Sequence, residues 1–152
     1  MIRVQSEPFD AAAELARFTD TLATSGAVVS FTGLVRGRRD DGEVCTLELE
    51  QYAGFTATVI AEIEADARSR FPLEDCIIIH RFGELAPGEP IVFVATASEH
   101  RRGAFEAADY LMDRLKTEAP FWKRECRSDG AAWIEPRQSD VRDRDRWNEK
   151  VS

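Results

Sequence analysis

The sequence predicts one domain of the α+β class, in which about three helices pack on a mostly antiparallel or mixed sheet. Segments with the alternation of strands and segments with helical periodicity follow one another along almost the whole chain. The length of 152 residues is that of a single domain, and no internal repeat divides it. With 43% apolar and 32% charged residues, the composition is that of an ordinary globular protein. Residues 1–152 are therefore expected to share one core.

The first half of the chain predicts a strand, a helix, two further strands and a second helix. Asp10 is placed as the N-cap of the first helix, and Pro72 stops the second. The strands are marked by valine and phenylalanine or by alternation of polar and apolar residues. The predicted ranges are Ile2–Gln5 (strand), Ala11–Leu22 (helix), Ala27–Val35 and Val44–Tyr52 (strands) and Thr56–Phe71 (helix). The polar residues 36–43 between the longer strands are expected to form a mobile loop.

The second half predicts a strand pair, a third helix and a hairpin. The connection GELAPGE supplies turn chemistry for the pair, Pro120 ends the helix, and Asp129-Gly130 marks the hairpin turn. The apolar stripe of the third helix consists of Phe105, Ala108, Leu111, Met112 and Leu115. The predicted strands are Cys76–Phe82 and Pro90–Ala97 for the pair, and Phe121–Arg127 and Ala131–Glu135 for the hairpin. Residues 139–152 are expected to be a charged tail that is at most partly helical.

The charge balance argues against two classes of partner. Twenty Lys and Arg stand against 28 Asp and Glu, so the formal net charge is −8. A surface this acidic repels nucleic-acid phosphates and anionic lipids at long range. The longest apolar runs are four or five residues, far below the roughly 20 needed to cross a bilayer. We therefore expect neither nucleic-acid binding nor membrane association.

Cysteine usage predicts a cytoplasmic protein without a metal centre. Cys45, Cys76 and Cys126 are odd in number and far apart, which favours thiols in a reducing compartment over disulfides or a zinc site. The N-terminal segment has a charge at Arg3 and no apolar stretch, unlike a signal peptide. The chain has two histidines, and it contains none of the usual nucleotide-loop, zincin or serine-hydrolase motifs. We expect no metal and no cofactor.

A basic group marks the start of the third helix. His100 and Arg101 stand where a strand ends and a helix begins, and free backbone N–H groups there favour an anion. Arginines at this position oppose the helix dipole, so a bound anion or a nearby acid is expected to offset the repulsion. The alternative is that Ser98 is simply an N-cap and that the basic side chains are solvated.

Lysine usage singles out Lys116 and Lys123. Three of the 20 basic residues are lysines, and these two are only seven positions apart. A partly desolvated ammonium can lose its proton near neutral pH, whereas a guanidinium cannot. Lys116 lies at the edge of the helical stripe, and Lys123 shares a strand face with Phe121 and Glu125. Both are candidate proton-transfer groups or nucleophiles, with a snorkelling or salt-bridged role as the alternative.

Arg36 is the candidate in the first half of the chain. It leaves a strand that contains Phe31 and Gly33, and a glycine within a strand allows another group to approach closely. The residues Arg38–Arg39 are expected to be solvated in the loop. His80, at the end of a strand, is expected to be a hydrogen-bonded structural histidine rather than a ligand.

Longer motifs then point to one family. The motifs are Phe31-Thr32-Gly33 with Val35-Arg36, His80-Arg81 with Gly83-Glu84-Leu85 and Gly88-Glu89, His100-Arg101, Ala104-Phe105-Glu106-Ala107, Asp113, Leu115-Lys116, Ala119-Pro120-Phe121-Trp122-Lys123-Arg124-Glu125 and Trp133-Ile134-Glu135. In these motifs and their spacing the sequence resembles the MoaE family, the large, catalytic subunits of molybdopterin synthase. The resemblance covers nearly the whole chain and implies the MoaE-like α/β hammerhead fold.

The resemblance implies a sulfurtransferase. Its substrate would be cyclic pyranopterin monophosphate, which receives a pair of sulfur atoms to form the dithiolene of molybdopterin. The sulfur would come from the C-terminal Gly-Gly thiocarboxylate of a small ubiquitin-like, MoaD-like subunit whose tail enters a pocket. A homodimer of large subunits would carry one small subunit at each far end, as a heterotetramer. The implied site residues are Lys116 and Lys123 (catalytic), Arg36, His100, Arg101 and Arg137 (anion binding), Phe31 and Met112 (pocket lining) and Glu125 (acidic, near the second lysine).

A non-catalytic module that binds an anionic pterin or a protein tail is the alternative from a different class. Arginine would serve binding equally well, so the lysines favour catalysis. The sequence leaves open whether Arg137 serves its own pocket or that of a neighbour, and which lysine is the acid and which the base. It assigns no role to residues 38–43 or to the tail.

Overall fold

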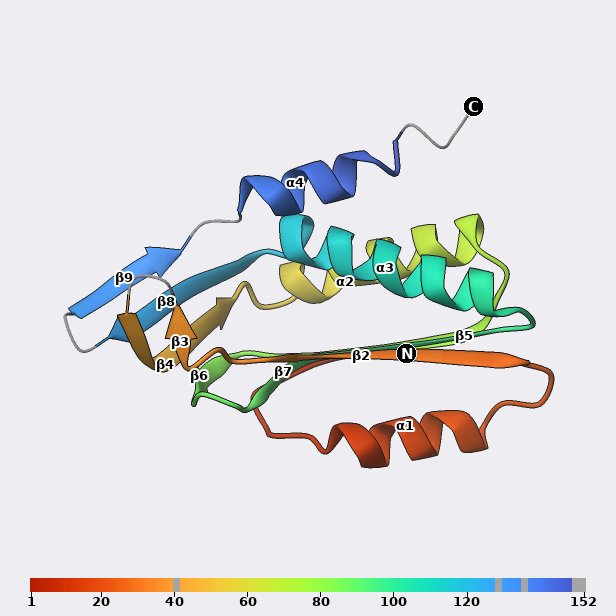
Figure 1. Ribbon diagram of the computed structural model, residues 1–152, viewed down its shortest axis with the longest axis horizontal. Helices are drawn as coiled ribbons and strands as arrows, with labels where there is room; N and C mark the ends of the chain where they lie inside the picture. The colour runs from red at the N-terminus through yellow and green to blue at the C-terminus, as the bar shows by residue number, and fades with distance from the viewer. Residues whose placement is uncertain (40–41, 128–129, 135–136, 149–152) are drawn as a thin grey trace.

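The computed structural model describes residues 1–39, 42–127, 130–134 and 137–148, which form two sheets and four helices (Figure 1). The elements are β1 (Ile2–Gln5), α1 (Ala11–Asp20), β2 (Ala27–Leu34), β3 (Arg38–Arg39), β4 (Gly42–Gln51), α2 (Phe55–Arg70), β5 (Leu73–Arg81), β6 (Gly83–Leu85), β7 (Pro90–Ser98), α3 (Arg101–Glu118), β8 (Phe121–Arg127), β9 (Gly130–Ile134) and α4 (Gln138–Asp145). The α+β class with a mixed, mostly antiparallel sheet is confirmed. No helix in these residues has the length and apolar content needed to cross a membrane.

The first sheet has helices on both of its faces. Its strand order is β1-β5-β7-β2, with β1 parallel to β5 and the other neighbours antiparallel. Helix α1 covers one face, and α2 and α3 cover the other (Figure 1). Ile77 and Ile79 of β5 pack with Phe18 of α1, whereas Ile78 packs with Ile63 and Leu111 of α2 and α3. Because both faces are buried, the central strands are almost continuously apolar.

The ends of the helices follow from their local chemistry. Asp10 caps α1 as predicted, because its Oδ1 accepts hydrogen bonds from the backbone N–H groups of Ala12 and Ala13 at 3.0 and 3.2 Å. The predicted alternative of an N-cap at Ser98 is wrong, since its hydroxyl instead donates to the Pro72 carbonyl at 2.7 Å. The predicted place of Phe105 in the apolar stripe of α3 is also wrong. Its side chain is 61% exposed, because the buried face of the helix is centred on the neighbouring alanines and Leu111.

The second sheet extends from one end of the first (Figure 1). Its strand order is β3-β4-β8-β9, and β6 also pairs with β4. The prediction of a loop over residues 36–43 is wrong in part, because Arg38 and Arg39 pair with Glu43 and Gly42 as a short hairpin. A ladder of backbone hydrogen bonds needs no apolar pattern, so polarity alone did not reveal it. Residues 40 and 41 at its tip lie outside the described residues.

The structure describes one of the two predicted turns, the connection GELAPGE, and leaves the tip of the hairpin turn outside the described residues. The connection GELAPGE contains a strand, β6, whose Leu85 is fully buried in the second sheet. The hairpin strands β8 and β9 are confirmed, and Arg127 pairs with Gly130. The predicted turn residues Ser128 and Asp129 lie outside the described residues, as do Glu135 and Lys150.

The predicted number of helices is one too low, because residues 138–145 form α4 along α3 (Figure 1). This helix has no apolar stripe, so its sequence is typical of a solvated tail. It is held by the residues that follow it. Trp147 is only 4% exposed and packs edge-on against Phe71 and Tyr110, and its Nε1 donates to Asp113 at 2.7 Å. Arg146 donates to Asp113 at 2.9 Å.

Candidate active site

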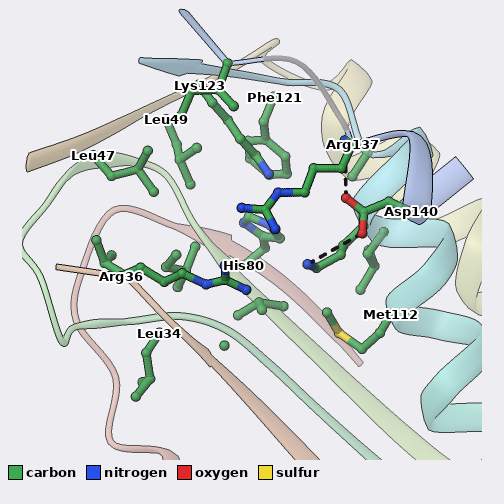
Figure 2. Close-up of a pocket in the computed structure, with 18 of the residues that line it drawn as sticks. Leu34, Arg36, Leu47, Leu49, His80, Met112, Phe121, Lys123, Arg137 and Asp140 are labelled. Carbon is green, nitrogen blue, oxygen red and sulfur yellow. Dashed lines mark hydrogen bonds and ion pairs between the residues drawn. The ribbon is translucent and has the colours of Figure 1, made fainter. Parts of the chain in front are cut away.

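A cavity of about 550 Å³ lies where the two sheets meet the C-terminal end of α3 and the start of α4 (Figure 2). This volume falls in the range of small-molecule sites. Much of the wall is apolar and comes from both sheets and α3, with Val44, Leu47, Leu49, Ile91, Val92, Leu115, Phe121 and Ile134 among its residues. An apolar wall lowers the local dielectric constant, which strengthens the effect of each charged group in the cavity.

Four basic side chains from separate parts of the chain line this cavity. Arg36 follows β2, Lys116 is in the last turn of α3, Lys123 is on β8, and Arg137 precedes α4. The carboxylates in the lining are those of Glu125 and Asp140. The cavity is therefore cationic, although the chain as a whole carries a net charge of −8. Such a site attracts a small anion.

The two lysines lie at the sides of the cavity. Lys116 is half-exposed, and its Nζ is 3.9 Å from Oδ1 of Asp140. Its position at the C-terminal end of α3 suits a cation, because the helix dipole is negative there. Lys123 lies between Leu49 of β4 and Ile134 of β9 in the ladder. It lines the cavity together with residues 121 and 125, as the alternation of β8 predicted.

Arg137 lies in the cavity of its own chain. Figure 2 shows its guanidinium and that of Arg36 converging from opposite sides. Its backbone N–H donates to Oδ2 of Asp140 at 3.4 Å, so the start of α4 holds the arginine and the carboxylate together. Two convergent guanidinium groups form an arrangement suited to phosphate.

The acidic and apolar residues predicted for the site also line the cavity. Glu125 is almost fully buried, and its Oε2 accepts from Nη2 and Nε of Arg127 at 2.7 and 3.1 Å. Phe31 and Met112 are both in the lining. The close approach predicted at Gly33 is to β7, since a Cβ there would be only 2.6 Å from Cγ1 of Val92.

His80 also lines the cavity, although its place at the end of an apolar strand predicts a structural role. Its ring stacks on Phe121 with 4.0 Å between centroids, and its Nδ1 is 2.9 Å from the carbonyl oxygen of Arg81. Burial is the main cause that lowers the pKa of His80 to about 4. The hydrogen bond to the Arg81 backbone raises this pKa, and the nearby charge of Lys123 lowers it. The imidazole is therefore uncharged at neutral pH.

His100 and Arg101 do not line the cavity of their own chain. They stand at the start of α3, about 22 Å along the helix axis from Lys116. Both are exposed, and Nε2 of His100 is 3.7 Å from a carboxylate oxygen of Glu99. The sequence predicted that a bound anion or a nearby acid offsets the repulsion between these basic residues and the helix dipole. The structure shows the nearby acid, Glu99. The predicted grouping of His100 and Arg101 with Arg36 around one anion is not formed within a single chain.

Two titratable residues of the cavity were not predicted as site residues, for different reasons. His80 follows three isoleucines in β5 and is buried like them. A histidine in such an apolar strand was the sequence feature that could have marked it as a site residue. Asp140 lies in the segment predicted as a tail, and no local pattern connects it to Lys116. In the described residues, no cluster of three His, Cys, Asp or Glu side chains could hold a metal ion.

Comparisons with known proteins agree with this geometry. A family model described as MoaE protein matches residues 4–118. The chain is 48% identical over 148 residues to a molybdopterin synthase catalytic subunit of Mesorhizobium japonicum, covering 96% of this chain and 92% of that protein. It is 52% identical over 122 residues to the molybdopterin synthase catalytic subunit of Escherichia coli K12, covering 80% and 81%.

Solved structures show the same fold. The molybdopterin biosynthesis MoaE protein from Burkholderia ambifaria superposes with a TM-score of 0.83 at 41% identity, over 97% of each chain. A molybdopterin synthase from Staphylococcus aureus has a TM-score of 0.80 at 32% identity, over 88% of this chain and 96% of that one. The first of these superpositions covers nearly the whole chain. This chain belongs to the MoaE family.

Proposed function

We propose that the chain is the catalytic subunit of a molybdopterin synthase and acts as a sulfurtransferase. The donor is the C-terminal thiocarboxylate of a small ubiquitin-like subunit, and the acceptor is cyclic pyranopterin monophosphate. One observation carries the proposal: the cavity combines two of the chain's three lysines with two convergent arginines, in an otherwise acidic protein. These groups match the proton transfers and the phosphate that this reaction involves.

The phosphate of the substrate is assigned to the arginines. Arg36 and Arg137 enter the cavity from opposite sides, and each can donate two hydrogen bonds to a phosphate (Figure 2). Guanidinium groups stay charged at every pH of interest, which suits binding rather than proton transfer. The pterin then lies against the apolar wall that includes Met112 and Leu49.

The lysines are assigned to the chemical steps. The thiocarboxylate sulfur is the nucleophile, and it forms a C–S bond with a carbon of the pterin while a C–O bond of that carbon breaks. The released oxygen stays with the phosphate or, once protonated, leaves as water. Water then cleaves the bond between that sulfur and the tail's acyl carbon, which leaves the sulfur on the pterin and a carboxylate on the tail. Lys123 beside the tail carbonyl stabilises the oxyanion, and Lys116 beside the pterin transfers protons. Asp140, 3.9 Å from the Lys116 ammonium, positions it.

His100 and Arg101 are assigned to the cavity of a second copy. Strand β2 is an edge of the first sheet and exposes Phe31 and Leu34, while Phe105 is exposed on the adjacent α3. Exposed apolar side chains beside an unpaired strand edge are typical of a surface that another chain covers. Phe31 also lines the cavity, so this surface borders the site. A homodimer over it, within a heterotetramer, would supply the basic pair in trans.

The reaction itself tests this function. The protein is mixed with a thiocarboxylated small subunit and cyclic pyranopterin monophosphate, and dithiolene product is measured. We expect product in proportion to the thiocarboxylate consumed. The same small subunit with a plain carboxylate tail is the control and should give none. Absence of product with the thiocarboxylate, while the small subunit still binds, would contradict the proposal.

A non-catalytic module that binds a pterin or a protein tail is the second candidate. It is favoured by the two arginines, since they would hold a phosphate without any turnover. It requires only positive charge at residues 116 and 123. Retention of ligand binding without any dithiolene formation would support this candidate.

The compartment is proposed to be the cytoplasm. All three cysteines are free thiols, and Cys76 is buried. Burial raises the pKa of the Cys76 thiol to about 12, so this group remains protonated and unreactive. Fractionation of cells that produce the protein, with detection of the chain in each fraction, tests the location.

A further inference from the structure

His80 presents a hydrogen-bond acceptor within a cavity whose charged groups are mainly donors. Its Nδ1 lies 2.9 Å from the Arg81 carbonyl oxygen, which can only accept, so Nδ1 carries the hydrogen. In the neutral ring the other nitrogen, Nε2, then has a lone pair. The stack on Phe121, with rings 18° from parallel, fixes the plane of the imidazole.

The Nε2 atom has no hydrogen-bond partner within the described part of the chain. In the described residues, the side-chain nitrogens that are fully enclosed and lack a hydrogen-bond partner are Nε of Arg3 and Nε of Arg114. Nε2 of His80 is not one of them. Because His80 lines the cavity and its Nε2 is not among those enclosed nitrogens, a group in the cavity can reach this acceptor. A ligand with a donor group can therefore complete its hydrogen bonding.

The charged side chains of the cavity are either donors or negatively charged acceptors. Arg36, Arg137 and the two lysines are donors only. The carboxylates are already engaged, Glu125 with Arg127 and Asp140 with Lys116. Hydroxyl groups in the lining can either donate or accept, so they do not discriminate between ligand groups. The neutral imidazole is an uncharged acceptor that cannot also donate at Nε2, so it selects for a donor.

We propose that Nε2 of His80 accepts a hydrogen bond from an N–H group of the pterin heterocycle, and that His80 is a specificity-determining residue of the site. This inference rests on the proposed function and extends it to the orientation of the substrate. A phosphate or a thiocarboxylate offers acceptors only, so either group is mismatched to Nε2, whereas a pterin ring carries N–H donors. His80 thus directs the heterocycle toward β5 and leaves the phosphate to Arg36 and Arg137.

The state of the imidazole is essential to this selection. A protonated ring would offer a donor at Nε2 and would be repelled by Lys123. Burial keeps the ring neutral at the pH of the cell, as its lowered pKa of about 4 reflects. The buried position at the end of β5 and the carbonyl of Arg81 therefore set both the charge and the tautomer.

Two variants at position 80 separate the acceptor from the ring. His80→Phe keeps an aromatic ring to stack on Phe121 but has no acceptor, whereas His80→Gln keeps an amide oxygen near the position of Nε2. Calorimetric titrations with cyclic pyranopterin monophosphate and with inorganic phosphate are compared for each variant. We expect His80→Phe to weaken pterin binding about tenfold, His80→Gln to weaken it less, and phosphate binding to change in neither.

Nitrogen NMR of the wild-type protein measures the chemical shift of Nε2. Pterin binding would leave this shift unchanged if His80 had a purely structural role. The chain has two histidines, so spectra of a His100→Ala variant assign the resonances of His80. We expect the Nε2 resonance of His80 to have the chemical shift of an unprotonated nitrogen. We expect this resonance to move upfield when pterin saturates the site and to stay in place when inorganic phosphate is added. This measurement does not depend on the folding of any variant at position 80.

The outcomes separate this inference from the proposed function. Pterin affinity of His80→Phe within about twofold of wild type, or an Nε2 resonance unmoved by pterin, would overturn the inference alone. An equal loss of pterin and phosphate affinity would overturn it too, because it would show a general disturbance of the cavity. A wild-type protein that binds no pterin and forms no dithiolene would overturn the proposed function and this inference with it.

Discussion

At the scale of single residues, the site depends on a division of labour between cation types. The arginines in the cavity are suited to binding an anion, whereas the proposed function assigns the chemical steps to Lys116 and Lys123. The chain uses lysine at only three of its 20 basic positions, so two lysines in one cavity match the need for proton transfer. This difference between the cation types can be tested directly.

Removal of the second ammonium should abolish most turnover. We expect Lys123→Ala to lower dithiolene formation by about a hundredfold or more, because the oxyanion of the tail loses its partner. The fold and the affinity for the small subunit should stay unchanged, as checked by circular dichroism and calorimetry. Lys150→Ala, which changes the lysine outside the described residues, is the matched control. Wild-type turnover by Lys123→Ala would exclude the lysine mechanism.

A charge-preserving change tests proton transfer at the first lysine. Lys116→Arg keeps a cation near Asp140 but cannot deprotonate at neutral pH. We expect it to bind pterin and to remain nearly inactive in single-turnover assays. Full activity would assign a purely electrostatic role to residue 116.

The buried imidazole predicts a loss of stability in mild acid. The folded pKa of His80 is about 4 and its ordinary value is 6.5, so the unfolded chain binds the proton more readily between these values. Folding stability is therefore complete well above pH 6.5 and falls as the pH drops toward 4. We expect a loss of about 2 kcal/mol between pH 7.5 and 5 in urea unfolding.

The same measurement on His80→Phe isolates this contribution, because the variant has no titratable side chain at position 80. The pKa values of Glu14 and Glu64 are lowered from 4.5, so the stability that these carboxylates add is lost only below that value. They leave the range above pH 5 undisturbed. Equal pH dependence in the wild type and the variant would show that His80 is not neutral in the folded protein.

At the scale of secondary-structure elements, α4 is the part that its sequence identifies least. It lacks an apolar face, yet it places Arg137 and Asp140 in the cavity. The anchor is Trp147, which lies beyond the helix and packs against Phe71 and Tyr110. A single buried tryptophan leaves no periodic pattern, so the fold-back of α4 could not be read from spacing.

Loss of this anchor should affect stability and binding together. We expect Trp147→Ala to lower the free energy of unfolding by about 3–5 kcal/mol, because it removes a buried ring and the hydrogen bond to Asp113. Phosphate affinity should also fall, since α4 no longer holds Arg137 in place. Val141→Ala, a 37%-exposed position on α4, is the control and should change neither quantity. Unchanged phosphate affinity in Trp147→Ala would show that α4 stays docked without its anchor.

Most of the other helices and strands could be predicted from the sequence, because the residues that mark them lie within or next to each element. Asp10 caps α1 and Pro72 follows the end of α2, as their residue types dictate. The alternation in β8 correctly put Lys123 and Glu125 on the face that lines the cavity. The strand β6 and the hairpin of β3 were missed, because short strands depend on a partner ladder rather than on their own composition.

At the scale of the whole molecule, the distance along α3 is the decisive constraint. His100 and Lys116 stand at opposite ends of one helix, so a single chain cannot bring both to one anion. The proposed homodimer would resolve this, because its two-fold symmetry would let the start of α3 in each copy serve the cavity of the other. A site made by two chains has a measurable consequence.

Two inactive variants should restore activity when mixed. We expect His100→Ala and Lys116→Ala each to be nearly inactive alone. After exchange of subunits, about half of the dimers are mixed and each has one intact cavity, so activity should recover to about a quarter of wild type. Mixing either variant with itself is the control. No recovery, despite mixed dimers in native mass spectrometry, would contradict a site shared between chains.

The sequence by itself determined the class of fold, most of the regular elements and the types of charged group in the site, because these follow from residue chemistry and short-range spacing. Only the tertiary structure decided which groups meet. It buried His80 against Phe121, brought Asp140 to Lys116 through the anchor at Trp147, and kept His100 away from both. The reason is physical: packing of distant segments depends on the complete set of surfaces, and a rigid helix keeps its ends apart whatever charges they carry.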